Sequence, residues 1–287
     1  MKLSLANRIL KPKNLTFVMG IINATSDSFY KESRTNFSIN YSVEKALKMI
    51  EDGADILDIG GESSRPGSEY INESEEIDRV LPLVEEIRKY NKDVAISIDT
   101  RKTNVIKVCV NSGADILNDI SALEDGENIA EFVALSNIPV ILMHKRGNPL
   151  TMQKNTIYAD VIRDVAEYLC SRADFAVSKG IKAEKIIFDL GICFGKNLEG
   201  NLSLISNCDF FKTCWRNSFV NNVPVLMALS RKSFLGELTG CSVENRLASS
   251  LTANIYSIIK GCDIVRVHDV KETVDSIKVL NELLKRG

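Results

Sequence analysis

The sequence predicts a single (β/α)8 barrel, the TIM-barrel form of the α/β class. Two observations carry this prediction: a helix–glycine–strand unit repeats, and eight apolar runs alternate with helical patterns. The phrase Gly-Ala-Asp-Ile-Leu occurs at 53–57 and at 113–117, and a near copy, Gly-Cys-Asp-Ile-Val, occupies 261–265. In each copy the glycine follows a helical pattern, as a C-cap does, and leads into an apolar run typical of a buried parallel strand.

Eight apolar runs have the length of buried strands. Pro139 and Pro224 directly precede two of them, a position at which a strand accepts proline. The runs are Thr16–Ile22, Asp55–Ile59, Val94–Ile98, Ile116–Asn118, Val140–Met143, Ile186–Phe188, Val225–Leu229 and Ile264–Val267. Eight strands in a chain of 287 residues match the size and strand count of a TIM barrel.

Helical patterns separate these runs and follow the last one. They are Ser42–Glu51, Ser74–Tyr90, Lys102–Asn111, Glu127–Leu135, Tyr158–Ser178, Leu202–Trp215, Val243–Lys260 and Val270–Lys285. We expect Ser42 and Ser74 to be N-caps, because a serine hydroxyl accepts a hydrogen bond from the first unpaired N–H groups of a helix.

A doubly wound open sheet is the alternative architecture. It needs no eighth strand, and it usually carries a Gly-x-Gly-x-x-Gly turn, which this sequence lacks. No linker rich in proline, glycine or serine divides the chain. We therefore expect one domain over residues 1–287.

Bulk composition restricts the class of protein. Hydrophobic residues make up 45% of the chain, enough for a sizeable core, and no run is long enough to span a membrane. The net charge of −2 provides no basic surface for nucleic acid or for an anionic membrane. The seven cysteines include no Cys-x-x-Cys pair, which favours reduced thiols over structural zinc or disulfides. Residues 1–13 lack a signal-peptide pattern, so we expect a cytoplasmic protein.

Polar side chains gather where the predicted strands end, which is the active-site face of a TIM barrel. They are Asn23, Asp58, Glu62, Asp99, Asn118, His144, Asp189, Ser230, Arg231, Lys232, Arg266 and His268. Aspartate and asparagine are depleted in strands and costly to bury unpaired, so the whole set indicates a site. For any single member, capping of the following helix is an alternative interpretation.

Three of these residues suit a flat ring. Asp99, Asn118 and Asp189 follow the third, fourth and sixth strands, so we expect their side chains to converge. Two carboxylates and an amide accept charge-assisted, bidentate hydrogen bonds from a planar partner rich in N–H donors. The sequence therefore predicts a flat nitrogen heterocycle as part of the ligand.

Other residues suit anions. Arg266, His268 and Asn23 come from the last and first strands, which are neighbours in a closed barrel, and phosphate is the usual anion there. The segment Ser230–Ser233 opens a helix, whose N–H groups favour a second anionic group. Gly60–Gly67 has paired glycines and a Pro-Gly turn around an arginine, which describes a loop that closes over a ligand, or an ordinary βα loop.

Eight motifs occur in one order along nearly the whole chain. They are Met19–Asn23, Gly60–Gly67, Ser97–Thr100, Asn118–Ile120, Met143–His144, Phe194–Asn197, Ser230–Phe234 and Arg266–Thr273. With them the chain resembles the dihydropteroate synthases of folate biosynthesis. The resemblance implies condensation of 6-hydroxymethyl-7,8-dihydropterin pyrophosphate with 4-aminobenzoate, with Mg²⁺ as cofactor and a homodimer as the assembly. Val243–Ile259 is the candidate dimer surface, and barrel packing explains this apolar run equally well.

The resemblance also implies a role for each site residue. The pterin ring is expected at Ser64, Asp99, Asn118, Met143, Asp189, Phe194 and Lys232; pyrophosphate at Asn23, Arg266 and His268; aminobenzoate at Thr25, Phe29, Arg65, Pro66 and Ser233. Asn23 is also the expected Mg²⁺ contact, and the catalytic set is Asn23, Arg65, Lys232, Arg266 and His268. The implied mechanism is dissociative: pyrophosphate leaves first, and the amine attacks a pterin-methyl cation, which closed loops at 20–36 and 61–70 protect from water.

The chain departs from the family pattern at several positions. These are Ser26 for proline and Lys31 for an acid in the first loop, Leu190 for proline, Cys193 for glycine, Ser64 for threonine and Ala228 for glycine. Glu32 can replace the acid missing at Lys31, and the Ala228 methyl is expected to crowd the pterin. A pterin-binding paralogue without synthase activity is therefore one alternative, and a pterin-dependent methyltransferase is another. The Glu62–Gly67 and Ser230–Phe234 segments argue against the methyltransferase.

Overall fold

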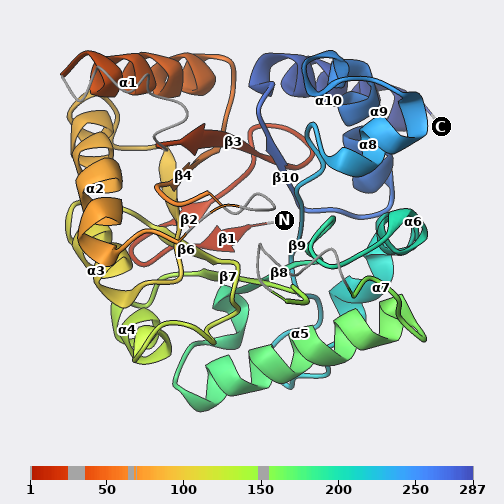
Figure 1. Ribbon diagram of the computed structural model, residues 1–287, viewed down its shortest axis with the longest axis horizontal. Helices are drawn as coiled ribbons and strands as arrows, with labels where there is room; N and C mark the ends of the chain where they lie inside the picture. The colour runs from red at the N-terminus through yellow and green to blue at the C-terminus, as the bar shows by residue number, and fades with distance from the viewer. Residues whose placement is uncertain (1, 25–35, 64–67, 69, 148–154, 287) are drawn as a thin grey trace.

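Eight parallel strands close into a barrel, and helices surround it (Figure 1). The computed structural model describes residues 2–24, 36–63, 68, 70–147 and 155–286. Strand order is β10-β3-β4-β5-β6-β7-β8-β9, and β10 pairs with both β3 and β9. The predicted (β/α)8 fold is therefore confirmed, and the open-sheet alternative is wrong.

The barrel strands begin and end within two residues of the predicted runs. They are β3 (Phe17–Asn23), β4 (Ile56–Gly60), β5 (Ala95–Asp99), β6 (Ile116–Asp119), β7 (Val140–Met143), β8 (Ile186–Asp189), β9 (Val225–Met227) and β10 (Ile264–Val267). The helices are α1 (Asn36–Glu51), α2 (Glu73–Tyr90), α3 (Thr103–Asn111), α4 (Ile129–Ser136), α5 (Val161–Ser178), α6 (Leu198–Ser206), α7 (Cys208–Thr213), α8 (Ser233–Thr239), α9 (Leu247–Ile259) and α10 (Val270–Leu284). None of the helices in the described ranges is long and apolar enough to cross a membrane.

Three details of the helix prediction are wrong. Ser42 lies inside α1, and Ser74 lies inside α2, so neither is an N-cap. Asn72 caps α2 instead, because its side chain accepts from the Glu75 N–H at 2.8 Å. The helix predicted over 202–215 is two helices, α6 and α7, which meet at Asn207. The Asn207 amide donates to the Ser203 carbonyl at 2.8 Å and so competes with the helical hydrogen-bond pattern.

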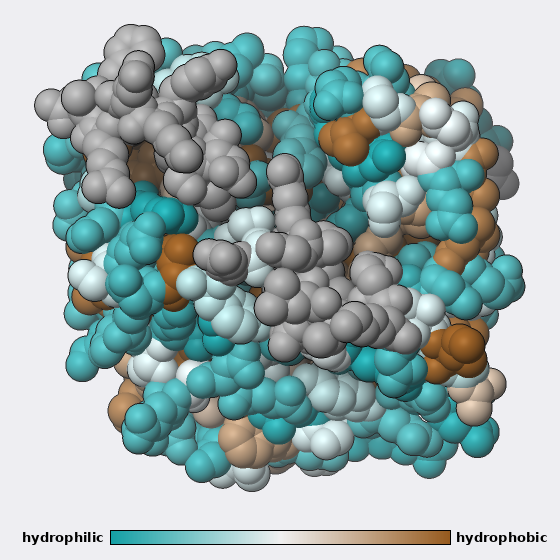
Figure 2. Space-filling model, viewed as in Figure 1, coloured by the Kyte–Doolittle hydropathy of each residue, from teal (hydrophilic) through white to brown (hydrophobic). Residues whose placement is uncertain are grey.

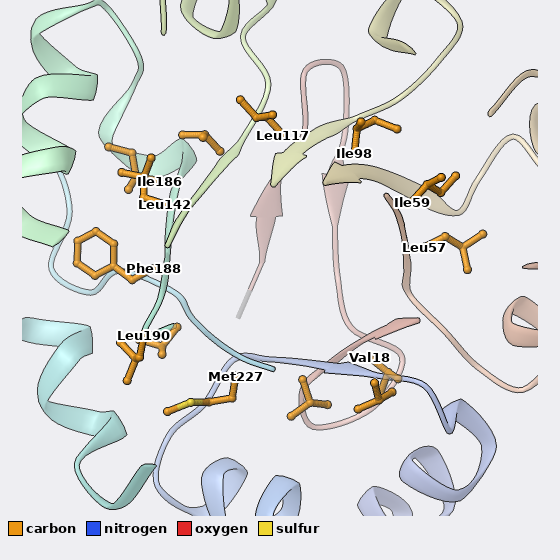
Figure 3. Packing of buried hydrophobic residues seen from close by; sticks show 14 of the residues in the cluster. Val18, Leu57, Ile59, Ile98, Leu117, Leu142, Ile186, Phe188, Leu190 and Met227 are labelled. Carbon is orange, nitrogen blue, oxygen red and sulfur yellow. The ribbon is translucent and has the colours of Figure 1, made fainter. Parts of the chain in front are cut away.

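Each barrel strand presents one apolar face to the helices. Figure 3 shows labelled residues of this outer core pointing from the strands toward the surrounding helices. Examples are Val18, Leu57, Ile98, Leu142 and Phe188, all of them buried. This two-sided burial explains why the strands appear in the sequence as short continuous apolar runs.

The inner face changes character along the barrel. Its amino-terminal half is an apolar cluster of Phe17, Met19, Ile56, Ala95, Ile116, Ile141, Ile187, Leu226 and Ile264. Two positions further along a strand, a side chain points to the same face, so Asp58 follows Ile56 and Asp189 follows Ile187. The interior is therefore apolar at one end and polar at the carboxyl end, where the predicted site lies.

A short antiparallel hairpin closes the apolar end of the barrel. It consists of β1 (Leu3–Ser4) and β2 (Ile9–Leu10), and the sequence did not predict it. Leu3 and Leu5 are buried in the inner apolar cluster. The buried ammonium of Lys185 donates to the carbonyls of Ser4 and Leu5 at 2.7 and 2.9 Å, which fixes the hairpin against the barrel.

Candidate active site

A cavity of about 310 Å³, measured with its open mouth, lies at the carboxyl ends of the strands. Its lining residues are Asp99, Asn118, Ile120, Met143, Asp189, Gly191, Ile192, Phe194, Ala228, Lys232 and Arg266. The structure thus brings together six of the residues expected at a pterin ring, and it adds Arg266 to them. The Ala228 methyl is part of the wall, so it takes up space that a glycine would leave open.

Arg266 is the centre of a buried ion cluster. Its Nε donates to Asp58 Oδ2 at 2.6 Å, and its Nη2 donates to Asp99 Oδ2 at 2.8 Å. The Asn118 amide also donates to Asp58 Oδ2, at 3.1 Å. Asp58 is fully buried, and its Oδ1 accepts no hydrogen bond from the described residues. Asp58 therefore orients two cavity-lining side chains, a role that the sequence analysis did not assign.

For both Asp99 and Arg266, burial and the charge of the ion-pair partner shift the pKa in opposite directions. Burial raises the pKa of Asp99 to about 7, although the neighbouring Arg266 lowers it. For Arg266 burial lowers the pKa, but Asp58 and Asp99 more than offset this, so the net pKa lies above the ordinary value. Arg266 therefore stays charged, and its Nη1 makes no hydrogen bond with the described residues.

Asp189 is placed to accept hydrogen bonds from a ligand. Its Oδ1 accepts from the Gly191 N–H at 2.8 Å, while Oδ2 accepts from none of the described residues. Burial raises the pKa of Asp189, whereas the Gly191 hydrogen bond and the charges of Lys232 and Arg266 lower it. The Gly191 backbone thus holds Asp189 Oδ1, and Oδ2 can accept from a ligand in the cavity.

Lys232 also lines the cavity, after β9, the strand next to β8. Its Nζ donates to the Ile192 carbonyl at 3.2 Å and lies 4.5 Å from the Phe194 ring centroid. Burial lowers the pKa of Lys232, while Asp189 and Asp99 raise it. The ammonium therefore stands over an aromatic face next to two carboxylates, an environment that suits a polar flat ring.

The departure at Cys193 has a structural consequence. Cys193 has φ of 70°, in the left-handed region that favours glycine, at a cost of about 1 kcal/mol for other residues. Its N–H donates to Asn201 Oδ1 at 2.7 Å, which holds the backbone in this conformation. The loop therefore adopts a glycine-type turn without the glycine. The Ser233 hydroxyl, at the start of α8, donates to Cys193 Sγ at 3.5 Å.

His268 lies beside the cavity with a defined hydrogen bond. Its Nδ1 is 3.1 Å from Ser230 Oγ, which also accepts from the His268 backbone N–H at 3.3 Å. Burial and the charges of Arg266 and Lys45 lower the pKa of His268 to about 4, so the ring is neutral at pH 7. With the Ser230 proton directed to Nδ1, the ring carries its own proton on Nε2, which can donate to an anion.

Some predicted residues do not join the cavity. His144 is buried behind it, with Nδ1 at 2.9 Å from Lys196 Nζ. Arg231 pairs with Asp269 at 2.6 Å. Asn23 ends β3, which neighbours β10 as predicted, but it does not line the cavity. Thr25, Ser26, Phe29, Lys31, Glu32, Ser64, Arg65 and Pro66 lie outside the described residues, so their roles stay predictions.

Glu62, in the Gly60–Gly67 motif, connects this motif to Ile71 and to the residues that follow β5. Its carboxylate accepts from Arg101 at 3.1 Å, from Lys102 at 2.7 Å and from the Ile71 N–H at 3.1 Å. The Arg101 guanidinium also stacks 3.8 Å above the Tyr70 ring. A smaller cavity of about 240 Å³ lies here, and Asp99 lines it too. The glycine-rich pattern predicted a loop but not this ionic anchor.

Fold and site together define a (β/α)8 enzyme with a cavity that carboxylate, amide and cationic side chains line. A family model described as "Pterin binding enzyme" matches residues 19–268. The chain is 40% identical over 262 residues to a dihydropteroate synthase of Haemophilus influenzae, covering 91% of this chain and 92% of that protein. It is 41% identical over 267 residues to the Escherichia coli enzyme, with coverage of 93% and 91%.

Solved structures agree with these sequence relatives. A Yersinia pestis dihydropteroate synthase with a sulfonamide drug complex matches with a TM-score of 0.90 and 34% identity, over 100% of both chains. A Burkholderia cenocepacia dihydropteroate synthase complexed with 7,8-dihydropteroate matches with a TM-score of 0.88 and 35% identity, over 99% of this chain and 97% of that one. This chain belongs to the dihydropteroate synthases of the pterin-binding enzyme family.

Proposed function

We propose that this chain joins 6-hydroxymethyl-7,8-dihydropterin pyrophosphate to 4-aminobenzoate, and that the cavity between Asp189 and Lys232 holds the pterin. The observation that carries the proposal is buried Asp189, whose Oδ2 accepts no hydrogen bond from the described residues and which lines a cavity together with Asn118 and Lys232. Adjacent N–H donors of a pterin would pair with such a carboxylate. The 7,8-dihydropteroate complex of the Burkholderia relative supports this choice of ligand.

The charge of the cavity suits a dissociative reaction. Three aspartates, Asp58, Asp99 and Asp189, stand against the two cations Arg266 and Lys232, so the set gains one net negative charge as the pH rises through the Asp99 pKa of about 7. In the proposed step the bond between the pterin methylene carbon and the pyrophosphate oxygen breaks, and its electron pair leaves with pyrophosphate. A pterin-methyl cation then develops in a negative cavity, which stabilises the transition state more than the neutral ring.

The second step forms the carbon–nitrogen bond. The aminobenzoate amine attacks the methylene cation, and the resulting ammonium loses one proton to the released pyrophosphate or to solvent. We place the aminobenzoate at the mouth, beside Ser233 and Phe194, with Thr25, Phe29, Arg65 and Pro66 as the further expected contacts. Arg266 Nη1, which makes no hydrogen bond within the described part of the chain, and the Nε2 proton of His268 would bind the pyrophosphate as its charge grows.

Mg²⁺ fits this site only together with its substrate. Among the described residues there is no group of three or more histidine, cysteine or acidic side chains that could hold a metal. Mg²⁺ commonly binds through one or two protein oxygens plus phosphate oxygens and water. Asn23, half-buried at the end of β3, offers one such amide oxygen. When bound, the ion would neutralise charge on the leaving pyrophosphate.

We also propose a homodimer through α8 and α9. The side of α9 that faces the barrel is largely polar, with Ser250, Asn254 and Ser257 buried. Apolar side chains face outward instead, including Tyr256 and Ile259, and Figure 2 shows apolar groups near these helices at the upper right. Barrel packing alone therefore does not account for the apolar residues of 243–259.

Sedimentation equilibrium is expected to give twice the monomer mass of 31.9 kDa, and Ile259→Lys is expected to give monomers.

The reaction is tested by an assay for 7,8-dihydropteroate with purified protein, both substrates and Mg²⁺. We expect product and pyrophosphate in equal amounts and loss of product formation when a chelator removes Mg²⁺. Absence of product with retained pterin binding would indicate the paralogue without synthase activity. Methyl transfer from a methylated pterin would instead support the methyltransferase alternative.

A further inference from the structure

The loop that follows β8 has an unusual backbone. Gly191, Cys193 and Gly195 have φ of 64°, 70° and 72°, so every second residue is left-handed. A Cβ on Gly191 would lie 1.8 Å from the His144 carbonyl oxygen, which shows how closely this loop packs against the end of β7. The carbonyls of Gly191 and Phe194 both accept from the Nζ of Lys196, a residue that does not line the cavity.

Lys196 is a buried side chain inside this loop, and burial lowers its pKa to about 7 although the charge of Asp189 raises it. Its Nζ is 2.7 Å from the Gly191 carbonyl oxygen, 3.1 Å from that of Phe194 and 2.9 Å from His144 Nδ1. The side chain is only 3% exposed. Burial and the charge of Lys196 lower the pKa of His144 to about 2, so the ring is neutral, and Nδ1 accepts from Lys196 in the tautomer that carries its proton on Nε2. Three ammonium protons thus meet three acceptors at short distance.

The other side of the same loop forms the cavity wall. The Gly191 N–H donates to Asp189 at 2.8 Å, and the Ile192 carbonyl accepts from Lys232 at 3.2 Å. Phe194 contributes its ring beneath the Lys232 ammonium. Two lysines therefore hold one loop from opposite sides, and only Lys232 reaches the cavity.

We infer that Lys196 is a positioning residue for pterin binding, which sets the Gly191–Phe194 wall from behind without touching the substrate. The inference rests on the proposed pterin cavity. Removal of the Lys196 Nζ leaves two loop carbonyls and His144 Nδ1 buried without a hydrogen-bond donor. Because unpaired buried acceptors cost free energy, a loop conformation that exposes them to water becomes more favourable. Such a change would move the Phe194 ring and the Gly191 N–H that orients Asp189.

Lys185 provides a matched control. It is also a lysine with 3% exposure, and it also donates to two backbone carbonyls, but at the opposite end of β8. Lys185→Met and Lys196→Met thus remove the same chemistry before and after one strand. Thermal unfolding measures the stability that each variant loses. Calorimetry with 6-hydroxymethyl-7,8-dihydropterin, which lacks pyrophosphate, measures the pterin affinity alone.

We expect Lys196→Met to bind this pterin about tenfold more weakly or worse, and Lys185→Met to bind it within twofold of wild type. Lys196→Gln keeps two N–H donors and should fall between wild type and Lys196→Met, so it supplies the comparison if the methionine variant does not fold. Unchanged pterin affinity in the folded Lys196 variants, or equal losses in the Lys185 and Lys196 variants, would overturn the inference. If wild type itself does not bind the pterin, the proposed cavity fails instead.

Discussion

Asp189→Asn is expected to lower the affinity for the pterin by about a hundredfold. The wild-type carboxylate uses Oδ1 for the Gly191 N–H and offers Oδ2 to the ligand. An asparagine in the same position keeps an oxygen toward Gly191 and therefore turns its NH2 group toward the donors of the pterin. The variant thus loses an ionic acceptor and also gains a donor–donor contact in a buried cavity.

Calorimetry with 6-hydroxymethyl-7,8-dihydropterin measures this effect directly. Asp55→Asn is the control, because Asp55 is also a buried aspartate that accepts backbone N–H groups, from Lys13 at 3.0 Å and Val18 at 2.9 Å. It lies at the apolar end of β4, so its loss should cost stability and leave pterin binding unchanged. Pterin affinity close to wild type in the Asp189 variant would contradict the position of the pterin.

Arg266→Leu is expected to destabilise the protein by about 3–5 kcal/mol and to abolish measurable turnover. The guanidinium is the shared partner of Asp58 and Asp99, and Asp58 is fully buried. Removal leaves two carboxylates close together in the barrel interior without their counter-charge. The substitution also removes the cation that we assign to the departing pyrophosphate.

The destabilisation should depend on pH. Without Arg266 the pKa of Asp99 rises above its wild-type value of about 7, whereas in the unfolded chain it is near 3.8. The folded variant then holds a proton that the unfolded chain releases, so its stability falls as the pH rises through the raised pKa. As the pH is lowered through 7, Asp99 is protonated in both proteins, and the difference between them should shrink.

Denaturant unfolding at pH 5 and at pH 8 measures the effect. Arg231→Leu is the control, because its ion pair with Asp269 lies at the same end of the barrel but in a more exposed place. Its removal is expected to cost about 1 kcal/mol or less. If Arg266→Leu and Arg231→Leu lower the free energy of unfolding equally at pH 8, the buried Arg266 cluster stabilises the protein no more than the exposed ion pair does.

The sequence predicted the barrel because a buried parallel strand requires a continuous apolar run, and eight such runs were visible. It also predicted that Asp99, Asn118 and Asp189 converge, because each follows a strand and strand ends meet at one face. Short elements were harder to predict. The β1–β2 hairpin, with two residues in each strand, was not predicted, and for α8 the sequence indicated the start at Ser230–Ser233 but not the extent, because seven residues are too few for a periodic signal.

Contacts between distant side chains were not predictable in the same way. Asp58 was visible at a strand end, but only the closed barrel shows that it orients Arg266 and Asn118. Lys196 belonged to a recognised motif, yet its burial depends on the left-handed turns at Gly191 and Cys193. The sequence identifies which groups reach this end of the barrel, and packing decides which of them pair.

The β1–β2 hairpin closes the end of the barrel opposite the active site. Leu3 and Leu5 fill the inner apolar cluster, so the described part of the barrel has no passage through its axis. Both substrates must enter, and both products must leave, by the same opening above Lys232 and Asp189. In the proposed pterin cavity, bound dihydropteroate would exclude the next pterin, so we expect product inhibition that is competitive with the pterin, and steady-state kinetics with added dihydropteroate measures it.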